Sequence, residues 1–177
     1  MSDLLKRLRE ALGAEGVLDS REASARARNY WDASPLEARA LARPRSTEDM
    51  SRVMRICHAL GQTVVIHGGL TGVCDGDRST ADDVVISLER MTQVEDIDVI
   101  GRTVTVQAGC TLQNLQLAVE RAGLYFPLDL GARGSCTVGG NVATNAGGIN
   151  VIRYGMTRAL VLGLEVVLAD GTVISSL

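Results

Sequence analysis

Glycine is crowded into one short segment of this 177-residue chain. Nineteen glycines occur in all, and seven of them lie between residues 131 and 155, which is too dense for an ordinary helix or strand. Between these glycines stand small residues, Ser, Thr and Asn, instead of periodic large apolar side chains. Such a surface lets the backbone approach a large flat ligand while hydroxyl and amide groups bond its polar edges. A low-complexity linker is the alternative, but an apolar hairpin pattern follows at once, so we expect the segment inside the fold.

A second glycine loop, HGGLTG, occupies residues 67–72. It follows residues 63–66, a short β-branched apolar run that predicts a buried strand. Three glycines in five positions let consecutive N–H groups turn toward an anion and form a nest for a pyrophosphate. The loop is neither a Walker A sequence nor a GxGxxG fingerprint. A tight glycine turn without a ligand is therefore an equal alternative on these residues alone.

Helical and strand patterns alternate irregularly along the chain, which predicts an α+β fold. We divide it into an N-terminal helix and connector (1–45) and a ligand-binding domain (46–177), with a smaller lobe at 46–90 and a larger lobe at 91–177. Helices are predicted at 4–12, 46–60 and 112–119. The second begins with a capping box of Ser46 and Asp49 and ends at Gly61, and the third ends at Gly123. Strands are predicted at 63–66, 84–88 and 103–106, and a hairpin joins 161–168 to 172–176 around Asp170-Gly171.

Composition excludes several classes of protein. Lys and Arg number 18 against 21 Asp and Glu, with no block of like charge, so nucleic acid is not an expected partner. No apolar stretch is long enough to span a bilayer. The first eighteen residues carry charges throughout, unlike a signal peptide or a mitochondrial presequence, so we predict a cytoplasmic protein. Cys57, Cys74, Cys110 and Cys136 form no CxxC pair, and we expect reduced thiols and no metal site.

Four stretches together carry a family resemblance: HGGLTG at 67–72, PLDLGARGSCTVGGNVATNAGG at 127–148, RYG at 153–155 and LGLEVVLADGTVI at 162–174. They resemble the N-terminal FAD-binding domain of the vanillyl-alcohol oxidase superfamily. The similarity covers residues 30 to 177 and points to the branch of D-lactate, glycolate and D-2-hydroxyglutarate dehydrogenases, with the second stretch most similar to the last group. The resemblance implies a two-lobed α+β domain that holds FAD and is C-terminally incomplete here, because relatives continue beyond residue 177 into a substrate domain.

The resemblance also implies the residues that bind the cofactor. The first loop would hold the FAD phosphates through Gly68, Gly69, Leu70, Thr71 and Gly72. The rest of the cofactor would be lined by Pro127, Asp129, Gly131, Cys136, Thr137, Gly140, Asn141, Thr144, Asn145, Gly147, Gly148, Tyr154 and Gly155. Two positions depart from the family pattern: Leu70 stands where relatives place Gly or Asn, and Asp75 where a glycine is common.

The implied reaction is oxidation of a D-2-hydroxy acid to the 2-oxo acid, with hydride transfer to flavin N5 and onward transfer of electrons to an electron-transfer flavoprotein or a quinone. No catalytic residue is predicted within the chain, and His67 is interpreted as a hydrogen-bonding residue, not a general base. Non-covalent FAD is expected, because no His or Cys lies between the loop glycines and Cys74. Two alternatives remain: a non-catalytic FAD- or nucleotide-binding module, and a flavoprotein like the enolpyruvyl-sugar reductase of cell-wall synthesis. Formation of a homo-oligomer is left open.

Overall fold

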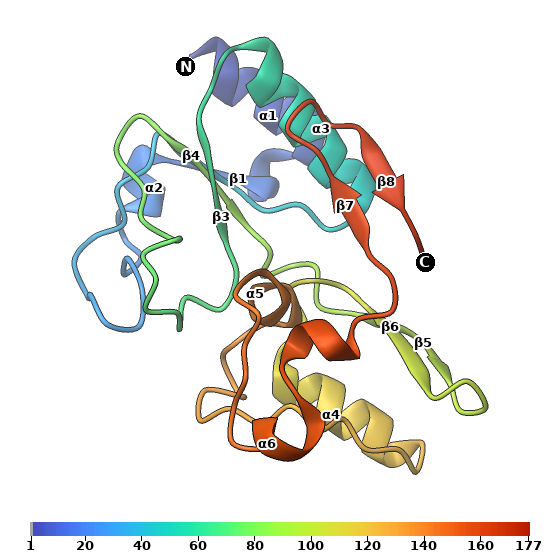
Figure 1. Ribbon diagram of the computed structural model, residues 1–177. Coiled ribbons are helices and arrows are strands. Elements are labelled where there is room, and N and C mark those ends of the chain that lie inside the picture. Colours follow the sequence, from blue (N-terminus) through green and yellow to red (C-terminus); the bar gives the residue numbers. More distant parts are fainter. Residues whose placement is uncertain (1) are drawn as a thin grey trace. The chain divides into compact units, whose positions relative to one another are not determined.

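The structure, a computed structural model, describes residues 2–177. The chain divides into two compact units: one runs up to Arg90 and is completed by Gly163–Leu177, and the other comprises Met91–Leu162 (Figure 1). Both units contain helices and strands, which confirms the predicted α+β class. Within residues 2–177, no helix has the length and apolarity needed to cross a membrane.

A four-stranded sheet in the order β1-β2-β4-β3 forms the centre of the first unit. Its strands are β1 (Val17–Asp19), β2 (Ala40–Ala42), β3 (Val64–His67) and β4 (Val84–Ser87). β1 runs antiparallel to β2, whereas β2, β4 and β3 are parallel, with Val84 in register with both Ala40 and Val64. All residues of β2 and β4 are buried, as expected for strands covered on both faces.

Helices cover one face of this sheet. α1 (Asp3–Leu12) and α3 (Thr47–Ala59) pack beside each other, as Figure 1 shows, and place Leu8 and Val53 against Val84 and Ile86. The opposite face is covered by the segment around α2 (Ser20–Ala23). The short η1 (Ala14–Gly16) joins α1 to β1. Because strand side chains alternate, Ala40 and Ala42 face the first helices and Leu41 faces the other layer.

The predicted capping box of α3 is half formed. The hydroxyl of Ser46 accepts a hydrogen bond from the backbone N–H of Asp49 over 3.2 Å, as expected of an N-cap. The carboxylate of Asp49 accepts instead from the backbone N–H of Arg45 over 3.1 Å and pairs with the Arg52 guanidinium. The helix therefore begins where the sequence predicts, with a different partner for the acidic residue.

The C-terminal hairpin belongs to the first unit. β7 (Glu165–Val167) and β8 (Val173–Ser175) are antiparallel, and β7 packs against α3. This arrangement differs from the expected division in two ways, because residues 1–45 supply β1 and β2 to the sheet and residues 163–177 do not group with residues 91–162. β1 and β2 have three residues each, and neither carries enough apolar alternation to be recognised from the sequence.

The second unit is built on the antiparallel pair β5 (Val94–Asp98) and β6 (Thr103–Val106). α4 (Leu112–Arg121) packs Leu115 and Val119 against these strands, and Gly123 ends it with φ +74°. The remaining elements are α5 (Val138–Ala143), α6 (Val151–Tyr154) and η2 (Thr157–Leu160). α5 lies in the glycine-rich segment, where no helix was expected.

Candidate cofactor-binding site

The first glycine loop leaves the sheet at the carboxyl end of β3, which pairs with the parallel strand β4. Ligands commonly bind at the carboxyl ends of parallel strands. The amide N–H groups of residues 68–72 donate no hydrogen bond to any other residue of the range 2–177. Leu70 has φ +56°, the left-handed conformation that turns successive amides of a nest inward. The loop therefore presents a run of free backbone donors, which is what an oxyanion ligand requires.

Contacts with residues 29–31 hold this loop in place. The backbone N–H of Tyr30 donates to the carbonyl of Leu70 over 3.1 Å, and Nε1 of Trp31 donates to the carbonyl of Thr71 over 3.3 Å. Farther along, Nδ2 of Asn29 donates to Oδ2 of Asp77 over 2.9 Å. The loop is thus held near its glycines through the carbonyl groups of Leu70 and Thr71, and the chain that follows it is held through the carboxylate of Asp77.

His67 is the last residue of β3 and is only 2% exposed. Its Nε2 lies 2.8 Å from the carbonyl oxygen of Asp77. Burial lowers the pKa of His67, and the Asp77 carbonyl opposes that shift only in part. His67 therefore supports the loop from within the sheet as a neutral side chain and is not placed to take a proton from a ligand.

An open cavity of about 410 Å³ adjoins the glycine end of the loop. Gly72, Val73 and Asp75 line it together with Arg28 and Trp31. The remaining lining residues are Asn29, Asp32 and Arg78. Arg28 is already paired, 3.3 Å from Asp32 and 3.6 Å from Glu37, so the cavity carries opposite charges in near balance.

The predicted site residues of the second unit gather around α5. Thr137 is its N-cap, and the Thr137 hydroxyl accepts from the N–H of Gly140 over 3.3 Å. Asn141 is buried, yet its Nδ2 forms no hydrogen bond within the described part of the chain. Burial raises the pKa of the neighbouring Cys136 thiol, and the Asn141 amide lies close enough to oppose this. Apart from this contact with the thiol, the buried amide donor has no partner within the described residues, which fits a ligand that offers an acceptor.

Some of the glycines serve packing inside the unit. A Cβ on Gly139 would lie 2.7 Å from the Cβ of Ala108, and the Gly139 N–H donates to the Ala108 carbonyl over 2.8 Å. A Cβ on Gly148, whose φ is +74°, would lie 2.0 Å from the carbonyl oxygen of Asp129. Gly131, in contrast, has open space where a Cβ would stand. Close packing against Ala108 and Asp129 therefore accounts for part of the glycine density that suggested a ligand surface.

Several other predicted residues bond within the unit. Asp129 pairs with Arg133 over 3.1 Å, and the Thr144 hydroxyl donates to the Gly140 carbonyl over 2.9 Å. Asn145, with φ +50°, accepts from the backbone N–H of Arg158 over 2.9 Å. These contacts keep the segment in its shape.

The remaining predicted residues lie near the start and end of the same segment. The carbonyl oxygen of Pro127 accepts a hydrogen bond from Nδ2 of Asn150 over 2.9 Å. The Tyr154 ring lies 6.0 Å from that of Tyr125, and Gly155, with φ +78°, ends α6. Gly147 would meet only ordinary contacts if it carried a Cβ, the nearest at 3.5 Å.

The structure places Gly68, Gly69, Leu70, Thr71 and Gly72 in the first unit and the other predicted residues in the second. The free amides of residues 68–72 suit the diphosphate of FAD, and the unpaired Asn141 amide suits a polar edge of its rings. Asn29, Trp31 and Asp77, which hold the first loop, were not identified from the sequence. No short-range pattern could reveal them, because the Trp31–Thr71 contact spans 40 residues.

Among proteins of known identity, the chain is 47% identical over 140 residues to D-2-hydroxyglutarate dehydrogenase, mitochondrial, of Bos taurus, covering 79% of this chain and 26% of that protein. It is 41% identical over 177 residues to a probable D-2-hydroxyglutarate dehydrogenase, mitochondrial, of Oryza sativa subsp. indica, covering 99% and 32%. The D-2-hydroxyglutarate dehydrogenase of Xanthomonas citri pv. viticola is 46% identical over 141 residues, or 80% and 29%. The chain thus spans about a third or less of these relatives.

The prediction of a cytoplasmic location was wrong, because the bovine and rice relatives are named as mitochondrial enzymes. It relied on the charged residues 1–18, which lack a leader pattern. A stretch of eighteen residues is not a guide to location when the chain spans only part of its relatives' length.

Solved structures agree on the fold. An alkyldihydroxyacetonephosphate synthase matches with a TM-score of 0.86 at 18% identity, over 99% of this chain and 34% of that one. A variant of berberine bridge enzyme matches with a TM-score of 0.80 at 22% identity, over 98% and 37%. The model of the FAD binding domain family matches residues 38–176. That match takes in both glycine segments and most of the C-terminal hairpin, and it shows that the chain belongs to the FAD binding domain family.

Proposed function

We propose that the chain is the FAD-binding part of an enzyme that oxidises a D-2-hydroxy acid to the corresponding 2-oxo acid, with D-2-hydroxyglutarate as the leading substrate. Membership of the FAD binding domain family supports the cofactor. The substrate rests on three relatives named as D-2-hydroxyglutarate dehydrogenases, from a mammal, a plant and a bacterium. D-Lactate and glycolate are the substrates to be compared with it.

The observation that carries the proposal is the row of unpaired N–H groups at residues 68–72. Backbone amides that have no partner within the described residues can donate to the diphosphate oxygens without first breaking other hydrogen bonds. Gly68, Gly69 and Gly72 carry no side chain that would stand between these donors and the phosphate oxygens. The loop thereby fixes the cofactor at its diphosphate.

In the second unit, we assign the cofactor surface to residues around α5. Thr137, Gly140 and Asn141 lie at or near its first turn, and the buried Nδ2 of Asn141 is available to an acceptor on the ligand. Gly131 and Gly147 leave space for close approach. When bound, FAD supplies the chemistry of accepting a hydride from the substrate carbon, and the chain's residues bind and orient it.

The flavin is held without a covalent bond in this proposal. Residues 68–72 include no Cys or His that could attach to it. Cys74 is exposed but lies past the last glycine of the loop. Acid precipitation of the full-length protein should therefore leave the flavin in the supernatant, and flavin fluorescence in the denatured protein would exclude a non-covalent cofactor.

We also propose that the reduced flavin passes its electrons to an electron-transfer flavoprotein or a quinone.

Flavin content tests the central assignment. Gly69→Val places a branched side chain among the proposed donors and should abolish retention of FAD in the full-length protein. Gly76→Val is the matched control in the same loop, because its Cβ would meet only the Cys74 sulfur, at 3.7 Å. Equal flavin content in the two folded variants would show that residues 68–72 do not hold the phosphates. Reduction of a dye by D-2-hydroxyglutarate, D-lactate and glycolate then ranks the substrates, and no reduction with any of them would favour a binding module that does no chemistry.

A further inference from the structure

We propose that residues 28–34 act as a clamp that fixes the direction of the phosphate-binding amides, with Trp31 as its positioning residue. The inference rests on the proposed role of residues 68–72. It concerns a part of the chain that lies outside the two glycine segments and outside the residues that would touch the cofactor.

Peptide geometry links the clamp to the donors. The peptide bonds of this loop are trans, so each carbonyl points opposite to the N–H of the next residue. The Leu70 carbonyl accepts from Tyr30 N, which turns the Thr71 N–H away from the clamp. The Thr71 carbonyl accepts from Trp31 Nε1, which turns the Gly72 N–H the same way. Two consecutive donors are thereby aimed together, away from the side that residues 30 and 31 occupy.

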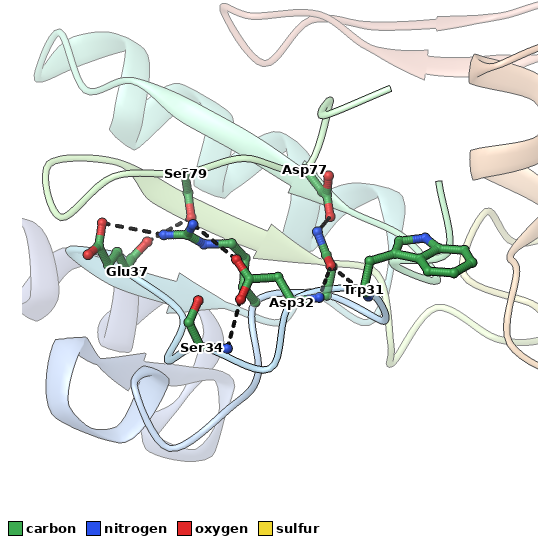
Figure 2. A network of polar contacts seen from close by, with 8 residues as sticks. Trp31, Asp32, Ser34, Glu37, Asp77 and Ser79 are labelled. Carbon is green, nitrogen blue, oxygen red and sulfur yellow. Dashed lines mark hydrogen bonds and ion pairs between the residues drawn. The ribbon is translucent and has the colours of Figure 1, made fainter. Parts of the chain in front are cut away.

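The clamp is itself held by a polar network (Figure 2). Oδ1 of Asn29 accepts from the backbone N–H of Trp31 over 2.9 Å and of Asp32 over 2.8 Å. Asp32 in turn accepts from the N–H of Ser34 over 2.9 Å and pairs with Arg28. These short-range bonds restrict the backbone conformation of the turn, and they thereby fix the position from which Trp31 reaches the loop.

The same turn also reaches the far end of the glycine loop. Nδ2 of Asn29 bonds Asp77, whose carbonyl lies 2.8 Å from Nε2 of the buried His67. Ser79, two residues later, donates from its hydroxyl to the carbonyl of Glu37 over 2.7 Å. The loop is therefore anchored on both sides of the free amides while the amides stay unpaired. A loop preset in this way loses less conformational entropy when it binds an anion.

Trp31 is suited to positioning and not to core packing. Its side chain is 65% exposed, and its ring meets the Tyr30 ring edge-on, with centroids 5.0 Å apart. Removal of the indole N–H should thus change the loop more than the stability of the unit. A loss of ligand affinity without a loss of stability would distinguish a positioning role from a merely structural one.

The test is a ligand titration of the flavin-free full-length protein with ADP and with inorganic pyrophosphate. Trp31→Phe keeps an aromatic ring but removes the donor to Thr71. We expect the variant to lower the affinity for both ligands by the same factor, about fivefold, which is the typical net effect of one hydrogen bond. Ser24→Ala is the control, because it removes another exposed donor to a backbone carbonyl, that of Arg21 at 2.8 Å, in the same unit. It should leave both affinities unchanged.

The unfolding midpoint without ligand is measured for each variant and should be equal in Trp31→Phe and Ser24→Ala. Asn29→Asp is the second variant. It keeps an oxygen acceptor for the N–H groups of residues 31 and 32 but replaces the donor to Asp77. It should also lower the affinity for ADP. Unchanged affinity in both clamp variants would overturn the clamp, while loss of FAD in Gly69→Val would leave the proposed function intact. A wild-type protein that binds neither FAD nor ADP would overturn both.

Discussion

The hydroxyl of Ser51 donates a hydrogen bond of 2.6 Å to the carbonyl oxygen of Gly171, and both groups are buried although 120 residues separate them in the chain. Ser51 lies on α3 and Gly171 in the turn between β7 and β8, so this bond docks the C-terminal hairpin on the helix. The Thr47 hydroxyl and the Glu165 carboxylate form a second bond between the same elements.

Gly171→Ala should lower the free energy of unfolding by about 2 to 4 kcal/mol, from a strained φ and a steric clash together. Gly171 has φ +83°, and a Cβ there would lie 2.4 Å from Cγ of Arg55 and 2.7 Å from the carbonyl of Ser51. Gly13→Ala is the control, because Gly13 has φ +78° but no atom within 4 Å of its Cβ position. Chemical denaturation of both variants would separate the clash from the strain. Equal losses would mean that the hairpin shifts freely on α3.

Leu70→Gly should raise stability by about 1 kcal/mol or leave it unchanged, because Leu70 is held at φ +56°, where a side chain is unfavourable. FAD affinity should be preserved, since the backbone donors remain. Leu70→Val should lower both quantities, because a β-branched residue resists this conformation more strongly. Thermal unfolding and flavin titration of the two variants provide the measurement. A large loss in Leu70→Gly would show that the leucine side chain, and not the backbone alone, shapes the loop.

Glu89→Gln should destabilise the protein at neutral pH and not in acid. Burial raises the pKa of Glu89, but hydrogen bonds and charge from Arg26, with bonds from Ser87 and Arg43, outweigh it and hold the pKa below its usual range. The folded pKa is below the unfolded value of about 4.3, so the contribution is present above that pH and is lost as pH falls through the folded pKa.

The expected difference between Glu89→Gln and wild type at pH 7 is about 1 kcal/mol, since the carboxylate keeps 32% of its side-chain exposure and water screens its ion pairs. Urea denaturation from pH 3 to 7 measures it. Glu10→Gln, an exposed change on α1, is the control. A destabilisation by Glu89→Gln that is the same at every pH would contradict an ionic origin.

Cys74 should be the first of the four cysteines of this chain to react with an aromatic disulfide reagent. It is exposed, whereas Cys57, Cys110 and Cys136 are buried, and burial raises the pKa of Cys57 to about 11. Addition of ADP should slow the reaction, because Cys74 lies two residues after Gly72. Mass spectrometry identifies the labelled peptide, with Cys74→Ser as the blank. Early labelling of Cys57 would indicate that α3 opens readily.

Glycines of the second unit should respond differently to alanine. Gly139→Ala should lower stability by about 1 to 3 kcal/mol through its contact with Ala108. Gly131→Ala has room for its methyl group and should leave stability unchanged. It should lower the affinity for FAD if residue 131 lines the cofactor. Parallel denaturation and flavin titration distinguish the two effects. Unaltered FAD affinity in Gly131→Ala would remove this residue from the site.

Long periodic elements could be predicted from the sequence, and short ones could not. The apolar stripes of α1, α3 and α4 and the β-branched runs of β3 and β4 carry their own signal. β2 consists of Ala-Leu-Ala and is a strand only because β4 and β1 flank it. α5 contains two glycines, which oppose helix formation, yet the Thr137 cap and the packing of Gly139 against Ala108 favour it.

The site shows the same division. The glycines of residues 68–72 could be identified from the sequence because their spacing is local. Their tethers could not, since the Asn29–Asp77 bond spans 48 residues and the Trp31–Thr71 bond 40. The family resemblance assigns Gly148 to the cofactor surface, and its closeness to the Asp129 carbonyl is a second reason for a glycine there, which the sequence does not reveal.

Because the chain leaves the first unit after Arg90 and re-enters it at Gly163, the second unit is an insertion within the first. A ribosome therefore releases α3 long before it releases the hairpin that docks on it. During that interval the helix surface around Ser51 and Arg55 is uncovered in every nascent molecule. Completion of the first unit requires closure of a long loop, and the unfinished intermediate is open to association with other chains and to chaperones.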